Sequence, residues 1–572
     1  MKAQRWTLLP YPDTEQVNVL ANAINVRPAI AAILLQRGIT DFEQARTFFV
    51  PLLEGLHDPF LMKDMKEAVE RLTNAVNRNE KILVYGDYDV DGTTAVALMY
   101  SFISSFYPNV DYYIPDRYKE GYGISSQGVH YAHEQGFSLI IALDCGIKSI
   151  DKVGLAHTFG IDFIICDHHL PGETIPDAVA VLDPKRNDCG YPFKELCGCG
   201  VGFKLVQAFC ESQGWSAQQA LQYLDLVAIS IAADIVPVNG ENRILSHHGL
   251  FALNHSPRRP GLKALLEHAA IKRELSVGDL VFTIAPRINA AGRITSGREA
   301  VSLLVATDAA DAREISRRID DNNSIRKDLD KSITSEALDM IAGSVSWQQA
   351  KTTVVYHEDW NKGVVGIVAS RLTETYYRPT IVLTRSGDKV AGSARSVRGY
   401  DVYRAIEACS VHLEQFGGHK YAAGLTLLPE NIDLFREAFE LEVCASITEE
   451  LLQPEIIIDA ALDFDQISMK FSTVLNRMSP FGPENMQPVF RADNVRDAGF
   501  AKRVGENHLK CLLYQENDPA VRFDAIGFKL DRFLPLLKSG KPFSIAYSIE
   551  QNVWNEQVAL QLVIKDIKEV KN

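Results

Sequence analysis

The sequence predicts an α/β protein with two α/β domains, a long connecting helix and a C-terminal β-barrel. From Lys81, short apolar runs alternate with polar clusters and helix-like stretches, which is typical of a doubly wound parallel sheet. A second pattern of this kind begins after Gly343. After Pro454, apolar and polar residues alternate in period two between frequent turns, as in a small antiparallel barrel. The length of 572 residues agrees with roughly two to four domains.

The first two regions of the chain lead up to the parallel sheet and form it. Residues 1–75 mix helical periodicity with proline breaks, and we expect a helical N-terminal region there. Residues 76–297 contain the apolar runs that we expect to be the strands of the first α/β domain. These runs are KILVYG, DYYI, FSLIIAL, GIDFIIC and AVAVL.

Three further regions follow the first α/β domain. From Arg298 to Met340 the chain has neither Pro nor Gly, and charged residues interrupt apolar residues at helical spacing. This pattern predicts a long, largely exposed connecting helix over residues 298–343. We expect the second α/β domain over residues 344–454 and the barrel over residues 455–572.

Composition and charge exclude several classes of protein. With 46% hydrophobic and 23% charged residues, the chain is expected to fold as a globular protein. Its net charge of −14 argues against a protein that coats DNA through a basic surface. No run approaches the roughly 20 apolar residues of a membrane span, so we expect a cytoplasmic protein without a membrane partner. The nine cysteines show no zinc-knuckle spacing and are expected to be reduced.

Acidic residues and histidines follow the ends of three of the predicted strands. Because the carboxyl ends of parallel strands meet at one edge of a sheet, these side chains are expected to converge there. Crowded carboxylates need a neutralising cation, and oxygen ligands with one or two imidazoles suit Mn²⁺ or Mg²⁺. The sequence therefore predicts a two-metal centre, which acts on phosphodiesters in many enzymes. The residues are Asp87, Asp89, Asp91, Asp144, Asp167, His168 and His169.

A further carboxylate, Asp234, lies in the apolar stretch LVAISIAADIVP, which we interpret as a buried helix ending at Pro237. A buried carboxylate must be paired or bound to a metal. Two alternatives are weaker. An EF-hand loop starting at Asp87 would need Glu at its twelfth position, where the chain has Leu98. A single Asp at a strand end is more often a helix cap than a ligand, so only the joint pattern favours a metal centre.

Five segments carry a resemblance to a known family. GDYDVDG, ALDCG, CDHH and AADIVP, in this order, resemble the motifs of the DHH phosphoesterase superfamily, and FGGHKYAAG resembles its associated DHHA1 domain. With the barrel-like tail, the chain is most similar to the RecJ-type exonucleases, which are specific for single-stranded DNA. The resemblance runs from about Lys81 to the C-terminus.

The resemblance implies a role for each residue of the predicted centre. Asp89 and Asp91 would bind different metal ions, and Asp144 would bridge them. His168 and Asp234 would complete the second site. His169 would lie beside the scissile phosphate as a hydrogen-bond donor, and Asp87 would orient the ligands from behind them.

One residue departs from the family pattern. Where many members of the superfamily have a histidine that binds the first metal, this chain has Tyr85. A phenol is a poor ligand for Mg²⁺ or Mn²⁺ at neutral pH. We therefore predict that the first of the two metal sites is weak.

The resemblance also implies a path for the substrate. Arg117 and Tyr122 would lie in a narrow passage, because a guanidinium can pair with phosphate and an aromatic ring can stack on a base. Arg293, Ser393 and Arg395 match positions that hold a terminal 5′-phosphate, and Asn289 is either part of this region or stabilises a turn. Gly418 and His419 would line the face opposite the metals.

The C-terminal region resembles an OB-fold, a barrel that commonly binds single strands through basic and aromatic side chains. The candidates are Arg496, Phe500, Lys502, Arg503 and Lys510. A run of charges is usually only a solvated face, so none of these is singled out.

The expected activity is metal-dependent hydrolysis of single-stranded DNA from the 5′ end to 5′-mononucleotides. Two alternatives remain: a DHH phosphodiesterase that acts on oligoribonucleotides or cyclic dinucleotides, and a strand-binding scaffold without activity. The resemblance implies roles in recombination, repair and mismatch repair. A single-strand-binding protein and a helicase are implied as partners, and we expect a monomer.

Overall fold

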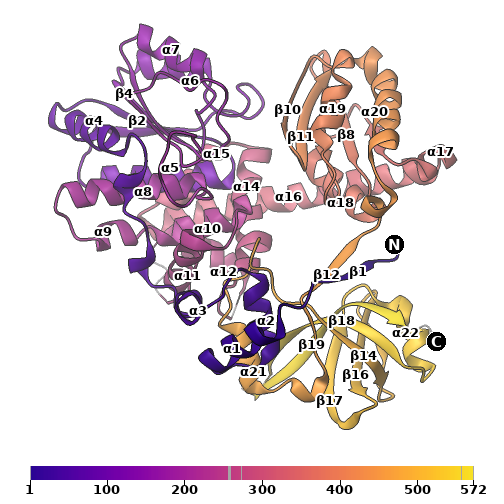
Figure 1. Ribbon diagram of the computed structural model, residues 1–572. Helices are drawn as coiled ribbons and strands as arrows, with labels where there is room; N and C mark the ends of the chain where they lie inside the picture. The colour runs from indigo at the N-terminus through magenta and orange to yellow at the C-terminus, as the bar shows by residue number, and fades with distance from the viewer. Residues whose placement is uncertain (1, 256–258, 272, 555–556, 571–572) are drawn as a thin grey trace. The chain divides into compact units, whose positions relative to one another are not determined.

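The computed structural model describes residues 2–255, 259–271, 273–554 and 557–570 (Figure 1). The chain divides into two compact units. The parallel-sheet unit contains residues 46–325 and 478–486, and the barrel unit contains residues 1–45, 326–477 and 487–572. The boundary between them falls inside helix α16 (Ala309–Ala342).

A five-stranded sheet in the order β3-β2-β4-β5-β6 forms the centre of the parallel-sheet unit. Every neighbouring pair runs parallel, as the sequence predicts. The central strands are fully buried because both faces are covered, which explains their continuous apolar sequence. The strands are β2 (Ile82–Gly86), β3 (Val110–Tyr113), β4 (Leu139–Leu143), β5 (Asp162–Cys166) and β6 (Ala180–Leu182).

Helices cover both faces of this sheet (Figure 1). Ile82 and Val84 of β2 belong to a core shared with α4 (Met65–Asn77), α5 (Val90–Ser104) and α8 (Gly198–Ser212). Leu83 and Tyr85 point to the opposite core, which α6 (Ser126–Glu134) and α7 (Ile150–Thr158) complete. Since all five strands run in one direction, the chain leaves β2, β4 and β5 at the same edge.

The rest of this unit is mainly helical. The connecting helix differs from its prediction. The single connecting helix expected over residues 298–343 is two helices, because the chain breaks after α15 and the Asp308 carboxylate caps α16 by accepting from the main-chain N–H groups of Ala310 and Asp311. The expected exposure is also only partial, since Ile319 and Ile333 of α16 are buried. The helices are α9 (Gln218–Leu221), α10 (Leu224–Asp234), α11 (Gly240–His255), α12 (Pro260–Ala269), α13 (Val277–Asp279), α14 (Ala285–Ile294) and α15 (Gly297–Val305), with a π-helical turn at Leu280–Ile284.

A short segment from far along the chain completes the parallel-sheet unit. Residues 478–486 belong to this unit although they lie in the sequence between parts of the barrel unit. The buried guanidinium of Arg243 donates to three consecutive main-chain carbonyl oxygens of the segment, at 2.9, 2.9 and 3.3 Å. The main-chain N–H of Val238 donates to the carbonyl oxygen of Pro483 at 2.8 Å. The segment therefore packs on the turn that follows α10.

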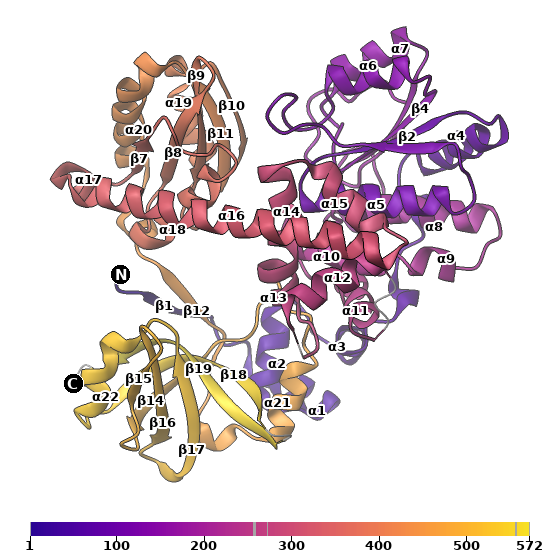
Figure 2. The ribbon, with the colours of Figure 1, turned by 180° about the vertical axis from the view of Figure 1, so that it is seen from behind.

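The barrel unit contains a mixed sheet in the order β10-β11-β9-β8-β7. Only β7 and β8 run parallel; the other neighbours are antiparallel. Figure 2 shows α18 and the C-terminal half of α16 beside this sheet, and α19 and α20 pack on its other face. The elements are β7 (Thr353–Tyr356), β8 (Thr380–Ser386), β9 (Lys389–Arg395), β10 (Gln415–His419), β11 (Ala422–Leu427), α17 (Val345–Gln349), α18 (Val365–Tyr376), α19 (Val402–Ala408) and α20 (Ile432–Ser446).

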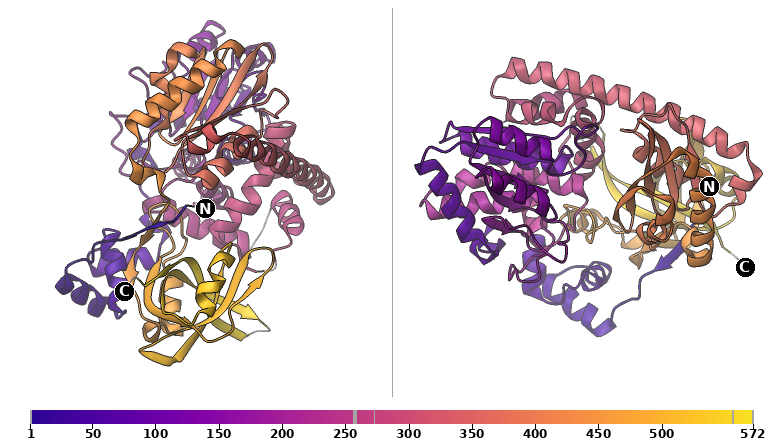
Figure 3. Two further views of the ribbon diagram at one scale, coloured as in Figure 1. Left: turned by 90° about the vertical axis from the view of Figure 1, so that its right-hand side faces the viewer. Right: turned by 90° about the horizontal axis from the view of Figure 1, so that it is seen from above.

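Five strands close into the C-terminal barrel, seen in yellow in Figure 3, because β14 pairs with both β18 and β16. The barrel is not wholly antiparallel as expected: the long hairpin of β18 and β19 brings β19 beside β17 in the same direction. The elements are β14 (Phe490–Asp497), β15 (Lys502–Val504), β16 (His508–Gln515), β17 (Asp518–Gly527), β18 (Phe543–Trp554), β19 (Gln557–Glu569), α21 (Met469–Asn476) and α22 (Leu534–Lys538).

The N-terminal region differs from the expected helical region at its start. Strand β1 (Arg5–Leu8) pairs in parallel with β12 (Glu455–Ile458), and helices begin only at α1 (Thr14–Ile24). Within the described ranges, no single helix is long and apolar enough to cross a membrane. Helices α1 and α2 (Pro28–Gln36) are long and apolar enough only when taken together, and they are bent by 111° relative to each other.

Candidate metal centre

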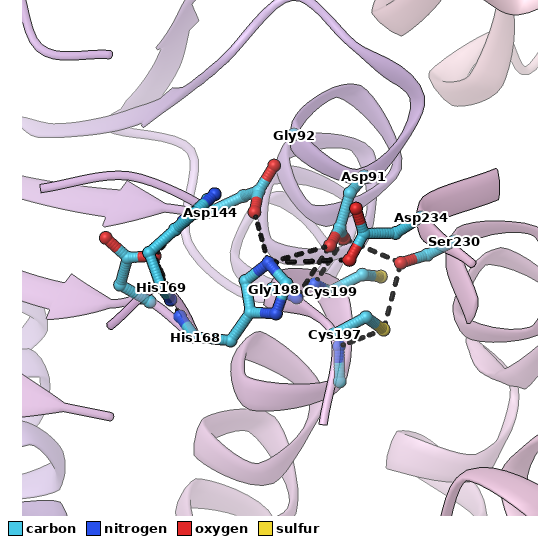
Figure 4. A network of polar contacts seen from close by, with 12 residues as sticks. Asp91, Gly92, Asp144, His168, His169, Cys197, Gly198, Cys199, Ser230 and Asp234 are labelled. Carbon is cyan, nitrogen blue, oxygen red and sulfur yellow. Dashed lines mark hydrogen bonds and ion pairs between the residues drawn. The ribbon is translucent and has the colours of Figure 1, made fainter. Parts of the chain in front are cut away.

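Five of the predicted residues lie together at the carboxyl edge of the sheet (Figure 4): Asp91, Asp144, His168, His169 and Asp234. Asp87 follows β2, Asp144 follows β4, and His168 follows β5 by one residue. Asp89 is the N-cap of α5, with its carboxylate accepting from the main-chain N–H of Gly92 at 3.0 Å. The topology therefore brings residues that are up to 147 positions apart (Asp87 to Asp234) to one place.

His168 lies at the middle of the cluster. Its Nε2 atom is 3.1 Å from Asp144 Oδ1, 3.5 Å from Asp234 Oδ2 and 3.7 Å from Asp91 Oδ2. Two sets of three potential ligands each have their ligand atoms within 4.8 Å of one another. The sets are Asp144, His168 and His169, and Asp91, His168 and Asp234.

Asp91 is held by three donors of the protein. The main-chain N–H groups of Gly198 and Cys199 donate to its two oxygens at 2.7 Å each, and the Ser230 hydroxyl donates to Oδ1 at 2.6 Å. Gly198 and Cys199 open α8, so the positive end of that helix faces the carboxylate. The sequence did not predict the roles of Gly198 and Cys199, because they donate through main-chain atoms. The only signal in the sequence is the Cys-Gly-Cys-Gly stretch.

Asp144 is placed by its own backbone. Its φ is 58°, in the left-handed region that is unusual for a residue with a side chain. The neighbouring chain leaves no space: a Cβ atom on Gly198 would lie 2.6 Å from both Cβ and Oδ1 of Asp144. Gly198 is therefore required by this close approach.

Asp167 holds the two histidines, a role that the sequence analysis left unassigned. Its Oδ1 accepts from the His168 main-chain N–H and from His169 Nδ1, both at 2.7 Å, and its Oδ2 accepts from the Ile147 main-chain N–H at 2.9 Å. Burial alone would lower the pKa of His169, but the hydrogen bond and charge of Asp167 raise that pKa to about 9. The Asp-His-His tripeptide was the signal that could have revealed this role.

The electrostatics of the cluster call for a cation. Burial, followed by the charges of neighbouring carboxylates, raises the pKa of Asp87, Asp89, Asp144 and Asp234 above the usual value. Several buried atoms here accept or donate no hydrogen bond: Asp87 Oδ2, Asp144 Oδ1 and both ring nitrogens of His168. Carboxylate oxygens with imidazole nitrogen are the ligand set that suits Mn²⁺ or Mg²⁺. The residues present thus fit such an ion.

Asp234 corrects the expectation of a carboxylate inside a buried helix. Its side chain is 32% exposed, because it is the last residue of α10 rather than an interior one. The next residue, Ile235, has a φ of 59° and ends the helix. Asp234 therefore lies at the rim of the cluster.

Tyr85 does not take part in the cluster. Its side chain is fully buried, and its hydroxyl donates to the Gly123 carbonyl oxygen and accepts from the Ser125 main-chain N–H, both at 3.1 Å. Burial raises the pKa of this phenol. The residue instead fixes the main chain of the loop that carries Tyr122.

A cavity of about 270 Å³ opens beside the carboxylates. Its lining joins Asp89, Asp91 and Asp234 to four residues that sequence analysis assigned to substrate or left open. Those four are Arg117, Tyr122, Asn289 and Arg293. The Tyr122 ring also lies edge-on to His169, with 6.1 Å between ring centroids.

The other predicted phosphate-binding residues belong to the barrel unit. On β9, Arg395 Nη1 donates to the Ser393 hydroxyl at 3.1 Å. Gly418 has a φ of 148°, and a Cβ there would lie 2.4 Å from the Ala422 carbonyl oxygen, so the tight hairpin of β10 and β11 requires glycine. The approach of Ser393, Arg395 and His419 to the parallel-sheet unit stays a prediction.

The candidates in the barrel are on its surface strands and loops. Arg496 pairs with Glu516, Arg503 pairs with Asp531 at 3.3 Å, and Phe500 is 63% exposed. Lys502 and Lys510 are register partners on β15 and β16. Their contact with a nucleic acid stays a prediction.

Three family models match this chain in succession. The DHH family N-terminal domain matches residues 81–231, the DHHA1 domain matches residues 349–443, and the RecJ OB domain matches residues 458–566. The single-stranded-DNA-specific exonuclease RecJ of Bacillus subtilis is 37% identical over 98% of this chain and 70% of its own length. The chain belongs to the RecJ family.

Other members of the RecJ family agree with this assignment. The single-stranded-DNA-specific exonuclease RecJ of Escherichia coli is 34% identical, over 88% of this chain and 90% of the relative. The crystal structure of Thermus thermophilus RecJ in complex with Mn²⁺ has a TM-score of 0.83 at 27% identity, over 99% of this chain and 80% of that one. A structure of exonuclease RecJ bound to manganese has a TM-score of 0.59 at 31% identity, over 68% of this chain and 96% of that one.

Proposed function

We propose that this chain is an exonuclease that hydrolyses single-stranded DNA from the 5′ end and releases 5′-mononucleotides in DNA recombination and repair. The observation that carries the proposal is the cluster of Asp91, Asp144, His168 and Asp234, with buried atoms that make no hydrogen bond, beside a cavity that two arginines line. The names of its RecJ relatives specify single-stranded DNA as their substrate.

Two divalent ions, Mn²⁺ or Mg²⁺, are proposed for the cluster. Asp89 and Asp91 would each hold one ion, Asp144 would lie between both, and His168 and Asp234 would complete the second site. When bound, such ions lower the pKa of a water molecule and stabilise charge on the phosphoryl group. Because Tyr85 binds main-chain groups instead, the first site should bind its ion more weakly than the second.

The side chains of the protein have separate tasks in this proposal. The three donors around Asp91 keep its carboxylate in one orientation, so no reorganisation is needed when substrate binds. Asp167 orients the His169 ring through Nδ1, and His169 would donate from Nε2 to a phosphate oxygen. Asp87 would orient the cluster from the end of β2.

The direction of cleavage is proposed to come from a pocket for the terminal phosphate. Arg293, Ser393 and Arg395 would bind the 5′-phosphate, because two guanidiniums and a hydroxyl are a selective site for a dianion. Gly418 and His419 would contact the strand near this point. The terminal nucleotide would then present its phosphodiester bond to the metal cluster.

One digestion experiment tests the proposal. Single strands labelled at the 5′ or the 3′ end are incubated with Mn²⁺, Mg²⁺ or a chelator, and the products are separated by length. We expect immediate release of a labelled mononucleotide from the 5′ label only, and no product with chelator. Release from the 3′ label, or cleavage of dinucleotides in preference to long strands, would contradict the proposal.

Partners are proposed from the family resemblance alone. A single-strand-binding protein and a helicase would supply the single strand, and the enzyme would act as a monomer. Light scattering of the purified protein tests the monomer, and a measured mass of two chains would contradict it.

A further inference from the structure

Arg117 lines the cavity beside the carboxylates. Within the described part of the chain, no hydrogen bond or ion pair holds its guanidinium. The contact that it does make is with an aromatic ring: its guanidinium carbon lies 4.9 Å from the centroid of Tyr88. A cation over a ring face is attracted by the ring quadrupole, and a guanidinium stacked in this way keeps its N–H groups for other partners.

Tyr88 itself is held firmly. It lies between Asp87 and Asp89, and its main-chain N–H donates to Asp87 Oδ1 at 2.7 Å. Two glycines allow neighbouring helices to approach it: a Cβ on Gly292 would lie 2.8 Å from the Tyr88 carbonyl oxygen, and a Cβ on Gly297 would lie 3.0 Å from the Tyr88 Cβ. The residue is therefore wedged between β2 and the helices α14 and α15.

The same ring also meets the second aromatic residue of the cavity. Tyr88 and Tyr122 pack edge to face, with 5.9 Å between ring centroids, and Tyr122 is 54% exposed. Both Tyr88 and Tyr122 line the cavity. The Tyr88 ring thus contacts both Arg117 and Tyr122. An arginine and an exposed aromatic residue are the groups that bind the phosphate and the base of a single strand.

We propose that Tyr88 is a positioning residue for single-stranded substrate, whose ring holds the Arg117 guanidinium and the Tyr122 ring at the wall of the metal-site cavity. This inference rests on the proposed exonuclease function. Tyr88 acts through its ring face, so its hydroxyl is dispensable. Its loss should weaken capture of the strand more than the chemical step, because the metal cluster does not depend on the ring.

Steady-state kinetics on a 5′-phosphorylated oligodeoxythymidylate with Mn²⁺ test this role. Tyr88→Leu is expected to raise KM roughly tenfold, the size of a cation–π contact in a partly dehydrated site, with kcat changed less than about twofold. Tyr88→Phe should keep KM within about twofold of the wild type. Tyr100→Leu is the matched control, because Tyr100 lies further along α5, packs on Tyr112 and is not among the residues that line the cavity.

A double-mutant cycle then asks whether Tyr88 acts through Arg117. In an Arg117→Gln background, Tyr88→Leu should raise KM by less than about threefold. The inference is wrong if Tyr88→Leu has its full effect in that background, if Tyr88→Phe is as damaging as Tyr88→Leu, or if the Tyr100→Leu control gives the same rise in KM.

A variant of unchanged shape keeps the test decisive if Tyr88→Leu fails to fold. Replacing Tyr88 by 3,4,5-trifluorophenylalanine withdraws electron density from the ring face and preserves its packing. We expect a KM several-fold above that of Tyr88→Phe, and equal KM values would overturn the inference. Fluorescence anisotropy in chelator measures strand binding without cleavage and distinguishes failure of this inference from failure of the proposed function. Wild-type protein that neither binds single strands in this assay nor cleaves them with Mn²⁺ would contradict the proposed function. An active wild type whose ring variants keep the wild-type KM would contradict only the role of Tyr88.

Discussion

Asp91 and Asp144 both lie near Nε2 of His168, at 3.7 and 3.1 Å, but the protein holds them in different ways (Figure 4). Asp91 accepts three hydrogen bonds, two from the start of α8 and one from Ser230. Asp144 Oδ1 is buried and accepts none, and the residue has left-handed backbone geometry. The first carboxylate is oriented by hydrogen bonds, and the second by backbone and close packing.

This difference teaches how one site can combine fixed geometry with high affinity for a cation. Hydrogen bonds to a carboxylate fix it but share its charge with the donors. A buried carboxylate oxygen without donors costs free energy until a cation binds, so it supplies driving force for metal binding. Asp144→Asn and Ser230→Ala each change one of these carboxylates or its donors, whereas Gly198→Ala affects both, because Gly198 approaches Asp144 and its main-chain N–H donates to Asp91.

The largest effect is expected for Asp144→Asn. Several kcal/mol of charge stabilisation depend on the ions, so we expect activity to fall about a thousandfold or more. In chelator, the melting temperature should stay equal or rise, because burial and the neighbouring carboxylates already raise the pKa of Asp144 and its negative charge opposes folding. Mn²⁺ should raise the melting temperature of the wild type and not of the variant. Substantial nuclease activity of Asp144→Asn would end this assignment.

A smaller loss is expected for Gly198→Ala, which crowds Asp144 without changing it. The added Cβ would lie 2.6 Å from the Asp144 side chain, and overpacking of this kind costs about 1–3 kcal/mol, which corresponds to roughly fivefold to 150-fold in metal affinity. Gly154→Ala in α7 is the control, since nothing lies within 4 Å of a Cβ there. Calorimetric titration with Mn²⁺ checks both variants, and equal affinities would show that the close approach is unimportant.

The smallest effect is expected for Ser230→Ala, which removes one of the three donors to Asp91. A hydrogen bond to a charged group contributes about 1.5 kcal/mol, so metal affinity should fall about tenfold while the two main-chain donors keep the carboxylate in place. Ser472→Ala is a control at another fully buried serine, in α21. A loss of metal affinity for Ser230→Ala as large as that for Asp144→Asn would contradict the expectation that the two main-chain donors alone keep the Asp91 carboxylate in place.

Much of the fold follows from local sequence patterns. The strands of both sheets are apolar runs bounded by polar clusters, and the rule that parallel strands share a carboxyl edge is enough to group Asp87, Asp144 and His168. The long helix was harder, because its break depends on one capping side chain, Asp308, inside a stretch without Pro or Gly. The β1 strand was missed because its partner, β12, lies about 450 residues away in the sequence.

The site was predictable in its charged residues and not in its supporting atoms. Residue types reveal Asp91 and His168, whereas the main-chain N–H groups of Gly198 and Cys199 have no sequence signature. The exposure of Asp234 depends on where α10 ends, and the left-handed Ile235 that ends it carries no glycine to mark the position. The role of Tyr88 was not predicted, because the acidic residues on either side of it, Asp87 and Asp89, were the ones interpreted as part of the metal centre.

The segment of residues 478–486 has a consequence for synthesis of the protein on the ribosome. Domains usually fold in order as the chain emerges, at about 5–20 residues per second. Here the parallel-sheet unit contains residues 46–325, yet the carbonyl groups that pair with the buried Arg243 guanidinium are made more than 150 residues later. The unit with the metal cluster is therefore completed only after the whole mixed sheet has been translated, so nascent chains that stop before residue 478 leave a buried cation without these partners.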